Sequence, residues 1–102
     1  MGTRIVVSGA NGRVGREIVK AVLADSQLEL VGAVGHEQGL GQDVGLLVGA
    51  QQPIGIELSA DLIETIEHTG AEVVVDFTRP AVVKDNLKAI AQAGAHAVIG
   101  TT

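Results

Sequence analysis

The chain has 102 residues, a length typical of one domain, and 46% of them are apolar, which excludes an intrinsically disordered protein. Its net charge is −5, with no cluster of Lys or Arg longer than a pair, which argues against nucleic acid as a partner; no apolar run is long enough to span a bilayer. The absence of cysteine excludes disulfides, thiolate catalysis and cysteine-ligated zinc, and we expect a cytoplasmic protein.

The first half of the chain alternates strand and helix patterns. Residues 4–8 form an apolar run that predicts a strand, and residues 13–25 carry apolar side chains at helical spacing. Residues 28–34 predict a second strand. Residues 35–52 are rich in glycine and predict a loop, with a short helical turn at 43–48.

The pattern continues with a third strand and another helix. Residues 54–58 predict a short strand, and residues 61–67 a short helix. Ser59 or Asp61 is suited to cap the start of this helix, and Gly70 is suited to stop it.

The last third of the chain predicts one more helix between two strands. Residues 73–75 are expected to form the fourth and most buried strand. Residues 80–93 predict a helix, with Pro80 in its first turn and Gly94 as its stop. Residues 97–99 predict a fifth strand, also buried.

Strands that alternate with helices in this way imply right-handed βαβ units and a parallel sheet. We expect an α/β fold of three layers with strand order 3-2-1-4-5, and a ligand crevice at the carboxyl ends of strands 1 and 4. Residues 100–102 follow the fifth strand at that same edge. Because this is an unusual place for a protein to stop, we expect residues 1–102 to be the N-terminal domain of a longer protein.

A glycine-rich turn joins the first strand to the first helix. Gly9 is expected to allow the tight turn, Gly12 to let a pyrophosphate approach the backbone, and Gly15 to let the helix pack closely. Arg13 and Arg16 add positive charge. A glycine-rich turn without function is the alternative, but its position at the first strand–helix junction favours a nucleotide site and a Rossmann-type fold.

The end of the second strand bears on the choice of cofactor. NAD sites carry Asp or Glu about 20 residues after the glycines, on the ribose 2′-hydroxyl. Gly35 stands there, followed by His36 and Glu37. Gly35 leaves room for a 2′-phosphate and His36 could donate to it, which favours NADPH, or use of both cofactors, over NADH alone. In the alternative interpretation, Glu37 supplies the acid.

Two further segments end strands at the same edge. Phe77, Thr78 and Arg79 follow the fourth strand, where Phe77 can lie against a ring and the other two can line a nicotinamide pocket. The alternative is a helix start that Thr78 caps. Residues 100–102 follow the fifth strand and are expected to contact cofactor or substrate.

Four segments together resemble the N-terminal domain of the dihydrodipicolinate reductases, also called 4-hydroxy-tetrahydrodipicolinate reductases. They are Gly-Ala-Asn-Gly-Arg-Val-Gly at 9–15, Leu-Gly-Gln-Asp-Val-Gly at 40–45, Val-Asp-Phe-Thr-Arg-Pro at 75–80 and Val-Ile-Gly-Thr-Thr at 98–102. The resemblance covers the whole chain. The glycine loop is shared with many dehydrogenases, whereas the third and fourth segments at their spacing are far more specific.

The resemblance implies a reductase that transfers hydride from NADPH or NADH to a cyclic imine dicarboxylate, giving tetrahydrodipicolinate in the diaminopimelate–lysine pathway. Members of the family often carry an acidic and then a basic residue where Gly35 and His36 stand, and this departure supports tolerance of NADPH. The cofactor contacts that the resemblance implies are Gly9, Ala10, Asn11, Gly12, Arg13, Val14, Gly35, His36, Phe77, Thr78, Gly100, Thr101 and Thr102.

In this family the catalytic His and Lys, the substrate-binding residues and the tetramer-forming sheet belong to a second domain. The resemblance therefore implies that this chain binds cofactor without turning over substrate, that the full-length protein is a homotetramer, and that no catalytic or metal-binding residue lies here. Two other hypotheses are a non-redox module that binds a nucleotide or coenzyme A, and a structural fragment too loose to bind a ligand.

Overall fold

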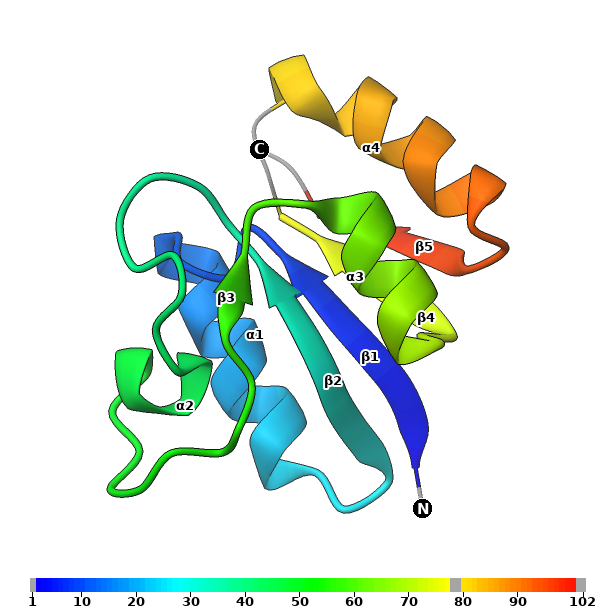
Figure 1. Cartoon of the computed structure of the whole chain (residues 1–102). Helices are drawn as coiled ribbons and strands as arrows, with labels where there is room; N and C mark the ends of the chain where they lie inside the picture. The colour runs from blue at the N-terminus through cyan, green and yellow to red at the C-terminus, as the bar shows by residue number, and fades with distance from the viewer. Residues whose placement is uncertain (1, 78–79, 101–102) are drawn as a thin grey trace.

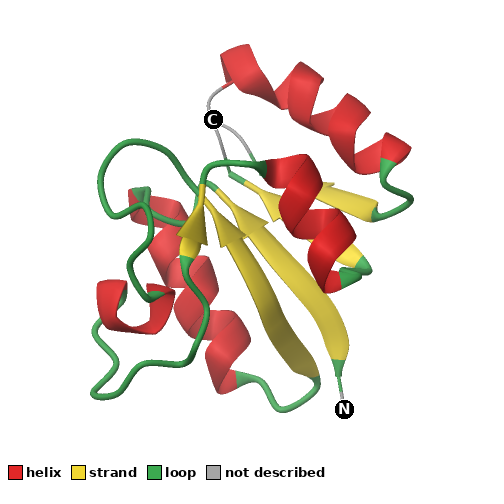
Figure 2. Ribbon diagram, in the orientation of Figure 1, coloured by secondary structure: helices red, strands yellow, loops and turns green. Residues whose placement is uncertain are grey.

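A parallel sheet between two layers of helices forms the core of the computed structural model, which describes residues 2–77 and 80–100 (Figures 1 and 2). The strand order is β3-β2-β1-β4-β5, as the sequence predicts. The elements are β1 (Thr3–Ser8), α1 (Arg13–Ala24), β2 (Leu28–Val34), α2 (Val44–Leu47), β3 (Leu58–Ser59), α3 (Leu62–Thr69), β4 (Val73–Asp76), α4 (Pro80–Gln92) and β5 (His96–Ile99).

The two faces of the sheet bury separate apolar cores because side chains alternate along each strand. Ile5 and Val7 of β1 pack on one face with Val19 of α1, and α2 completes that layer. Val6 lies on the other face, in a cluster with Ile66 of α3 and with residues of α4. The sheet is thus covered by α1 and α2 on one face and by α3 and α4 on the other (Figure 2).

The most buried strand is β1, so the expectation that β4 would be the most buried is wrong. Every residue from Ile5 to Ser8 is buried, whereas Val73 and Val75 of β4 are half-buried. The cause is position: both strands lie between two others, but β1 also packs against α1 on one face of the sheet and α3 on the other.

The third strand is shorter than predicted, because residues 54–57 wrap around α2 instead of pairing with β2. The Asp43 carboxylate caps α2 by accepting from Leu46 N at 3.2 Å, and it also accepts from Ile54 N at 3.1 Å and Gly55 N at 2.7 Å. Only Leu58–Ser59 pairs with β2. An acidic residue at a helix start predicts that its side chain caps the helix. The sequence does not predict that Ile54 N and Gly55 N, eleven and twelve residues further on, also donate to Asp43.

The same carboxylate has a perturbed pKa. Partial burial works toward a higher pKa for Asp43, but hydrogen bonds from the backbone N–H groups of Ile54, Gly55, Leu46 and Gly45 outweigh it and lower the pKa below its usual value of 3.8. The ionised carboxylate is therefore the form that holds this loop together.

The fifth strand is exposed, although the sequence predicts a buried one. All four residues of β5 are exposed, and Val98 is 54% accessible. Among the described residues β5 pairs only with β4, and α1 packs over β1 and β2 rather than over β5. An apolar run does not reveal whether its strand lies at the centre or the edge of a sheet.

Helix ends agree with the sequence to within two residues. Asp61 caps α3 by accepting from Glu64 N at 3.0 Å, and Gly70 ends α3 in the left-handed conformation at φ +67°. Gly94, at φ +79°, follows α4. These signals are local, which is why the sequence suffices to locate them.

Candidate functional site

The glycine loop lies at the carboxyl end of β1, and its glycines serve different purposes. Gly9 adopts φ +84°, which an L-residue with a side chain rarely accepts. A Cβ on Gly15 would overlap the carbonyl oxygen of Gly9 and lie 2.7 Å from its carbonyl carbon. Gly15 therefore lets α1 touch the loop, and both of these expectations are confirmed.

Gly12 forms the start of α1. It is the N-cap residue, at φ −81°, and offers no side-chain acceptor to the helix. The first N–H groups of a helix have no intrahelical partner, so the amides at the start of α1 remain open to an external anion. Gly12 and its neighbours Arg13 and Val14 are exposed, which suits the predicted pyrophosphate contacts.

Ala10 has a different position from the rest of the loop. Its side chain is only 1% exposed, and its N–H donates to Val34 O at 3.0 Å, as Gly9 N does at 2.8 Å. The first two residues of the loop are thus bonded to the end of β2. Any ligand contact by Ala10 would use atoms other than its amide and methyl group.

Asn11 connects the loop to the segment after β2. Its Nδ2 donates to His36 O at 2.8 Å and to Gln38 O at 2.9 Å. A Cβ on Gly35 would overlap Asn11 Oδ1 and lie 2.7 Å from its Cγ. Asn11, Gly35 and His36 therefore meet, but the room next to Gly35 is filled by Asn11 rather than left open for a phosphate.

Phe77 and Gly100 also meet at this edge. Phe77 N donates to Ser8 O at 3.0 Å, and Gly100 N donates to Asp76 O at 2.9 Å, extending the strand pairings. A Cβ on Gly100 would overlap Cε1 of the Phe77 ring and lie 2.6 Å from Cζ. The ring thus lies over Gly100. The other predicted contacts here, Thr78, Thr101 and Thr102, lie outside the described residues.

The sequence gives no particular signal for the role of Asp76. Its side chain is fully buried at the end of β4, and its Oδ2 accepts from Asn86 Nδ2 of α4 at 3.0 Å. Burying a carboxylate is unfavourable without such partners. Asp76 and Asn86 therefore fix α4 to the strand end that leads into the predicted nicotinamide side of the site.

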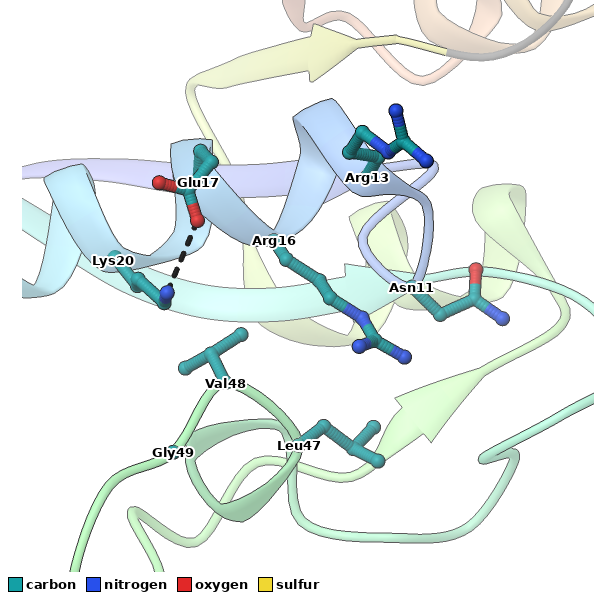
Figure 3. Close-up of a pocket in the computed structure, with 8 residues that line it drawn as sticks. All are labelled: Asn11, Arg13, Arg16, Glu17, Lys20, Leu47, Val48 and Gly49. Carbon is teal, nitrogen blue, oxygen red and sulfur yellow. Dashed lines mark hydrogen bonds and ion pairs between the residues drawn. The ribbon is translucent and has the colours of Figure 1, made fainter.

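A cavity of about 540 Å³ adjoins the glycine loop, between α1 and the turn of α2 (Figure 3). Its charged lining residues are Arg13, Arg16, Glu17 and Lys20, and Lys20 Nζ lies 3.0 Å from Glu17 Oε2. Figure 3 shows the Arg16 side chain extending toward Asn11 and Leu47. We call this cavity the α1–α2 groove; it is lined by Asn11, Arg13, Arg16, Glu17, Lys20 and residues 47–49.

The described part of the chain contains neither a metal-ligand cluster nor a membrane-spanning helix. Within it, no group of three His, Asp or Glu side chains is placed to hold a metal ion. In the same residues, no helix has both the length and the apolar character needed to cross a bilayer. His68 and His96 are exposed.

The parallel sheet in the order 3-2-1-4-5 and the glycine loop at the first strand–helix turn define a Rossmann-type nucleotide-binding domain. Residues 3–102 match the family model described as "Dihydrodipicolinate reductase, N-terminus". The chain belongs to this family and corresponds to its N-terminal part, which confirms the resemblance seen in the four motifs.

Comparisons with individual proteins support this family assignment. The 4-hydroxy-tetrahydrodipicolinate reductase of Desulfitobacterium hafniense (strain DSM 10664 / DCB-2) is 42% identical over 100 residues, covering 97% of this chain and 37% of that protein. The dipicolinate-bound dihydrodipicolinate reductase from Paenisporosarcina sp. TG-14 matches with a TM-score of 0.79 and 26% identity, over 100% of this chain and 38% of the other. An amine dehydrogenase from Mycobacterium smegmatis matches with a TM-score of 0.82 and 30% identity, over 97% and 30%. The chain thus spans between 30% and 38% of the length of these proteins.

Proposed function

We propose that this chain is the cofactor-binding domain of a 4-hydroxy-tetrahydrodipicolinate reductase and that it binds NADPH or NADH. The observation that carries the proposal is the meeting of the glycine loop and the Phe77–Gly100 pair at one sheet edge, in a chain of this family. The bound dinucleotide supplies the hydride chemistry, and the residues of this chain bind and orient it.

The described residues suggest how the cofactor would be held. The open amides at the start of α1 suit the pyrophosphate, since Gly12 places no side chain there and Arg13 adds charge. The Phe77 ring offers an apolar surface for the nicotinamide. The missing acid at Gly35 supports a preference for NADPH, because a carboxylate there would repel a 2′-phosphate.

The rest of the proposal concerns the full-length protein. Hydride transfer to the cyclic imine dicarboxylate would need a second domain that supplies the catalytic and substrate-binding residues. The curated relatives are nearly three times as long as this chain, which supports that division. On this view the chain alone binds cofactor without catalysis, and the full-length enzyme is a cytoplasmic homotetramer of the diaminopimelate–lysine pathway.

Titration of the 102-residue chain with NADPH, NADH and coenzyme A tests the proposal. We expect calorimetry to detect both dinucleotides, and amide chemical-shift changes at residues 9–15 and at Phe77. Tighter binding of coenzyme A would favour the non-redox module. A well-folded chain that binds no dinucleotide would refute binding by this domain alone.

A further inference from the structure

The α1–α2 groove opens directly beside the end of β2. Asn11 belongs to its lining, and the same side chain holds His36 O and Gln38 O. The residue after β2 is where a dinucleotide-binding fold reads the adenosine ribose, by an acid for the 2′-hydroxyl or an arginine for the 2′-phosphate. Gly35 itself carries no side chain, so any side-chain contact at this point has to come from other residues.

The charge of the groove is strongly positive. Three cationic side chains, those of Arg13, Arg16 and Lys20, and one carboxylate, that of Glu17, line the groove. Glu17 forms its ion pair with Lys20 and not with Arg16. Within residues 2–77 and 80–100, no acidic group lies within ion-pair distance of Arg16. Arg16 is exposed, and Figure 3 shows its guanidinium between Asn11 and Leu47. The groove therefore contains a guanidinium group that forms no ion pair with an acidic side chain of the described residues.

A phosphate monoester matches this arrangement. A guanidinium group can donate two parallel hydrogen bonds to phosphate oxygens, and Arg remains charged at every physiological pH. A free ribose 2′-hydroxyl gains little binding energy from the same guanidinium group. The groove is lined by α1 and the α2 turn, and not by His36. The space beside Gly35 is also filled by Asn11, so the room for a phosphate lies on the Arg16 side.

We propose that Arg16 binds the 2′-phosphate of NADPH in the α1–α2 groove, and that Arg16 rather than His36 discriminates NADPH from NADH. This inference rests on the proposed function, since it assumes that the chain binds a dinucleotide. On this proposal Arg16 of α1, and not a residue of the segment after β2, determines the cofactor preference.

The test compares Arg16→Gln with the unchanged chain in titrations with NADPH and NADH. Loss of a charge-assisted hydrogen-bonded contact is expected to weaken NADPH binding about 10-fold or more, and NADH binding by less than about 2-fold. The ligands 2′,5′-ADP and 5′-ADP should show the same contrast without the nicotinamide. Added salt should reduce the contrast, because the groove is exposed.

Two variants serve as controls. Lys88→Gln removes one positive charge from an exposed position on α4 and should change neither affinity. Arg13→Gln lies beside the proposed pyrophosphate contacts and should weaken both dinucleotides by similar factors. Circular dichroism of each variant checks that the fold is retained.

The outcomes separate the two proposals. If the unchanged chain binds neither dinucleotide, the proposed function fails. If it binds both and Arg16→Gln weakens them equally, or if His36→Gln alone removes the preference for 2′-phosphate, the proposed function stands and the assignment to Arg16 is overturned.

Discussion

Replacing Gly15 with Ala tests whether the contact between α1 and the glycine loop determines both stability and binding. The new methyl group would overlap Gly9 O and lie 2.7 Å from the Gly9 carbonyl carbon and 3.0 Å from Ala10 Cα. These are backbone atoms, which cannot swing aside as a flexible side chain can. Restoring ordinary contact of 3.4 Å to the carbonyl carbon alone requires a relative shift of about 0.7 Å between helix and loop, and relieving the overlap with Gly9 O requires a larger one.

The expected change in the free energy of unfolding of Gly15→Ala combines two opposing effects. Forcing a methyl group into a well-packed site costs about 1–3 kcal/mol, with backbone overlap toward the upper end. Ala in place of Gly inside a helix returns about 0.8–1 kcal/mol. We therefore expect the free energy of unfolding of Gly15→Ala to fall by about 1–2 kcal/mol. The shift also moves the amides at the start of α1, so NADPH affinity should fall about 10-fold.

Urea unfolding followed by circular dichroism measures the first quantity, and calorimetric titration measures the second. Gly12→Ala is the matched control, because its methyl group would lie 3.3 Å from Gly9 O and its φ of −81° is ordinary. We expect its stability to fall by about 0.5–1 kcal/mol, because Gly is a better N-cap residue than Ala, while its affinity falls. The reasoning is refuted if Gly15→Ala is as stable as the parent and binds NADPH equally well.

Three further predictions concern other contacts of the site. Gly35→Ala should destabilise the chain by about 1–3 kcal/mol alone, and by clearly less in an Asn11→Ala background, because the methyl group would then have room; urea unfolding of the four proteins gives the coupling. Asp43→Ala should destabilise the chain above about pH 3.8, with the difference from the parent shrinking below it, because the lowered pKa of Asp43 means that its stabilising carboxylate is lost on acidification; melts across the acid range measure this. Gly100→Ala should displace the Phe77 ring and weaken NADPH binding with little loss of stability, as seen by titration.

Each of these has an outcome that contradicts it. Additive effects of Gly35→Ala and Asn11→Ala would show that the two side chains do not compete for the same space. A pH-independent effect of Asp43→Ala would show that its charge is not what the loop requires. Unchanged NADPH affinity in Gly100→Ala would remove the Phe77 ring from the nicotinamide side.

The sequence determined the order of the elements and the position of the glycine loop. Strand runs, helical spacing, the Asp61 cap and the stops at Gly70 and Gly94 are signals carried by a few adjacent residues. The parallel sheet in its order follows from their alternation, because connections between parallel strands are right-handed. The turn at Gly9 and the helix approach at Gly15 also follow from spacing alone.

The tertiary structure decided which distant residues meet. Asn11 fills the space beside Gly35 and binds carbonyls 25 and 27 residues away, and Asp43 draws residues 54 and 55 away from the sheet. The exposure of β5 depends on which helices cover it, and the α1–α2 groove depends on how the α2 turn lies along Arg16 and Lys20. Such contacts depend on how the backbone between them folds, and local periodicity and propensity carry no information about that path.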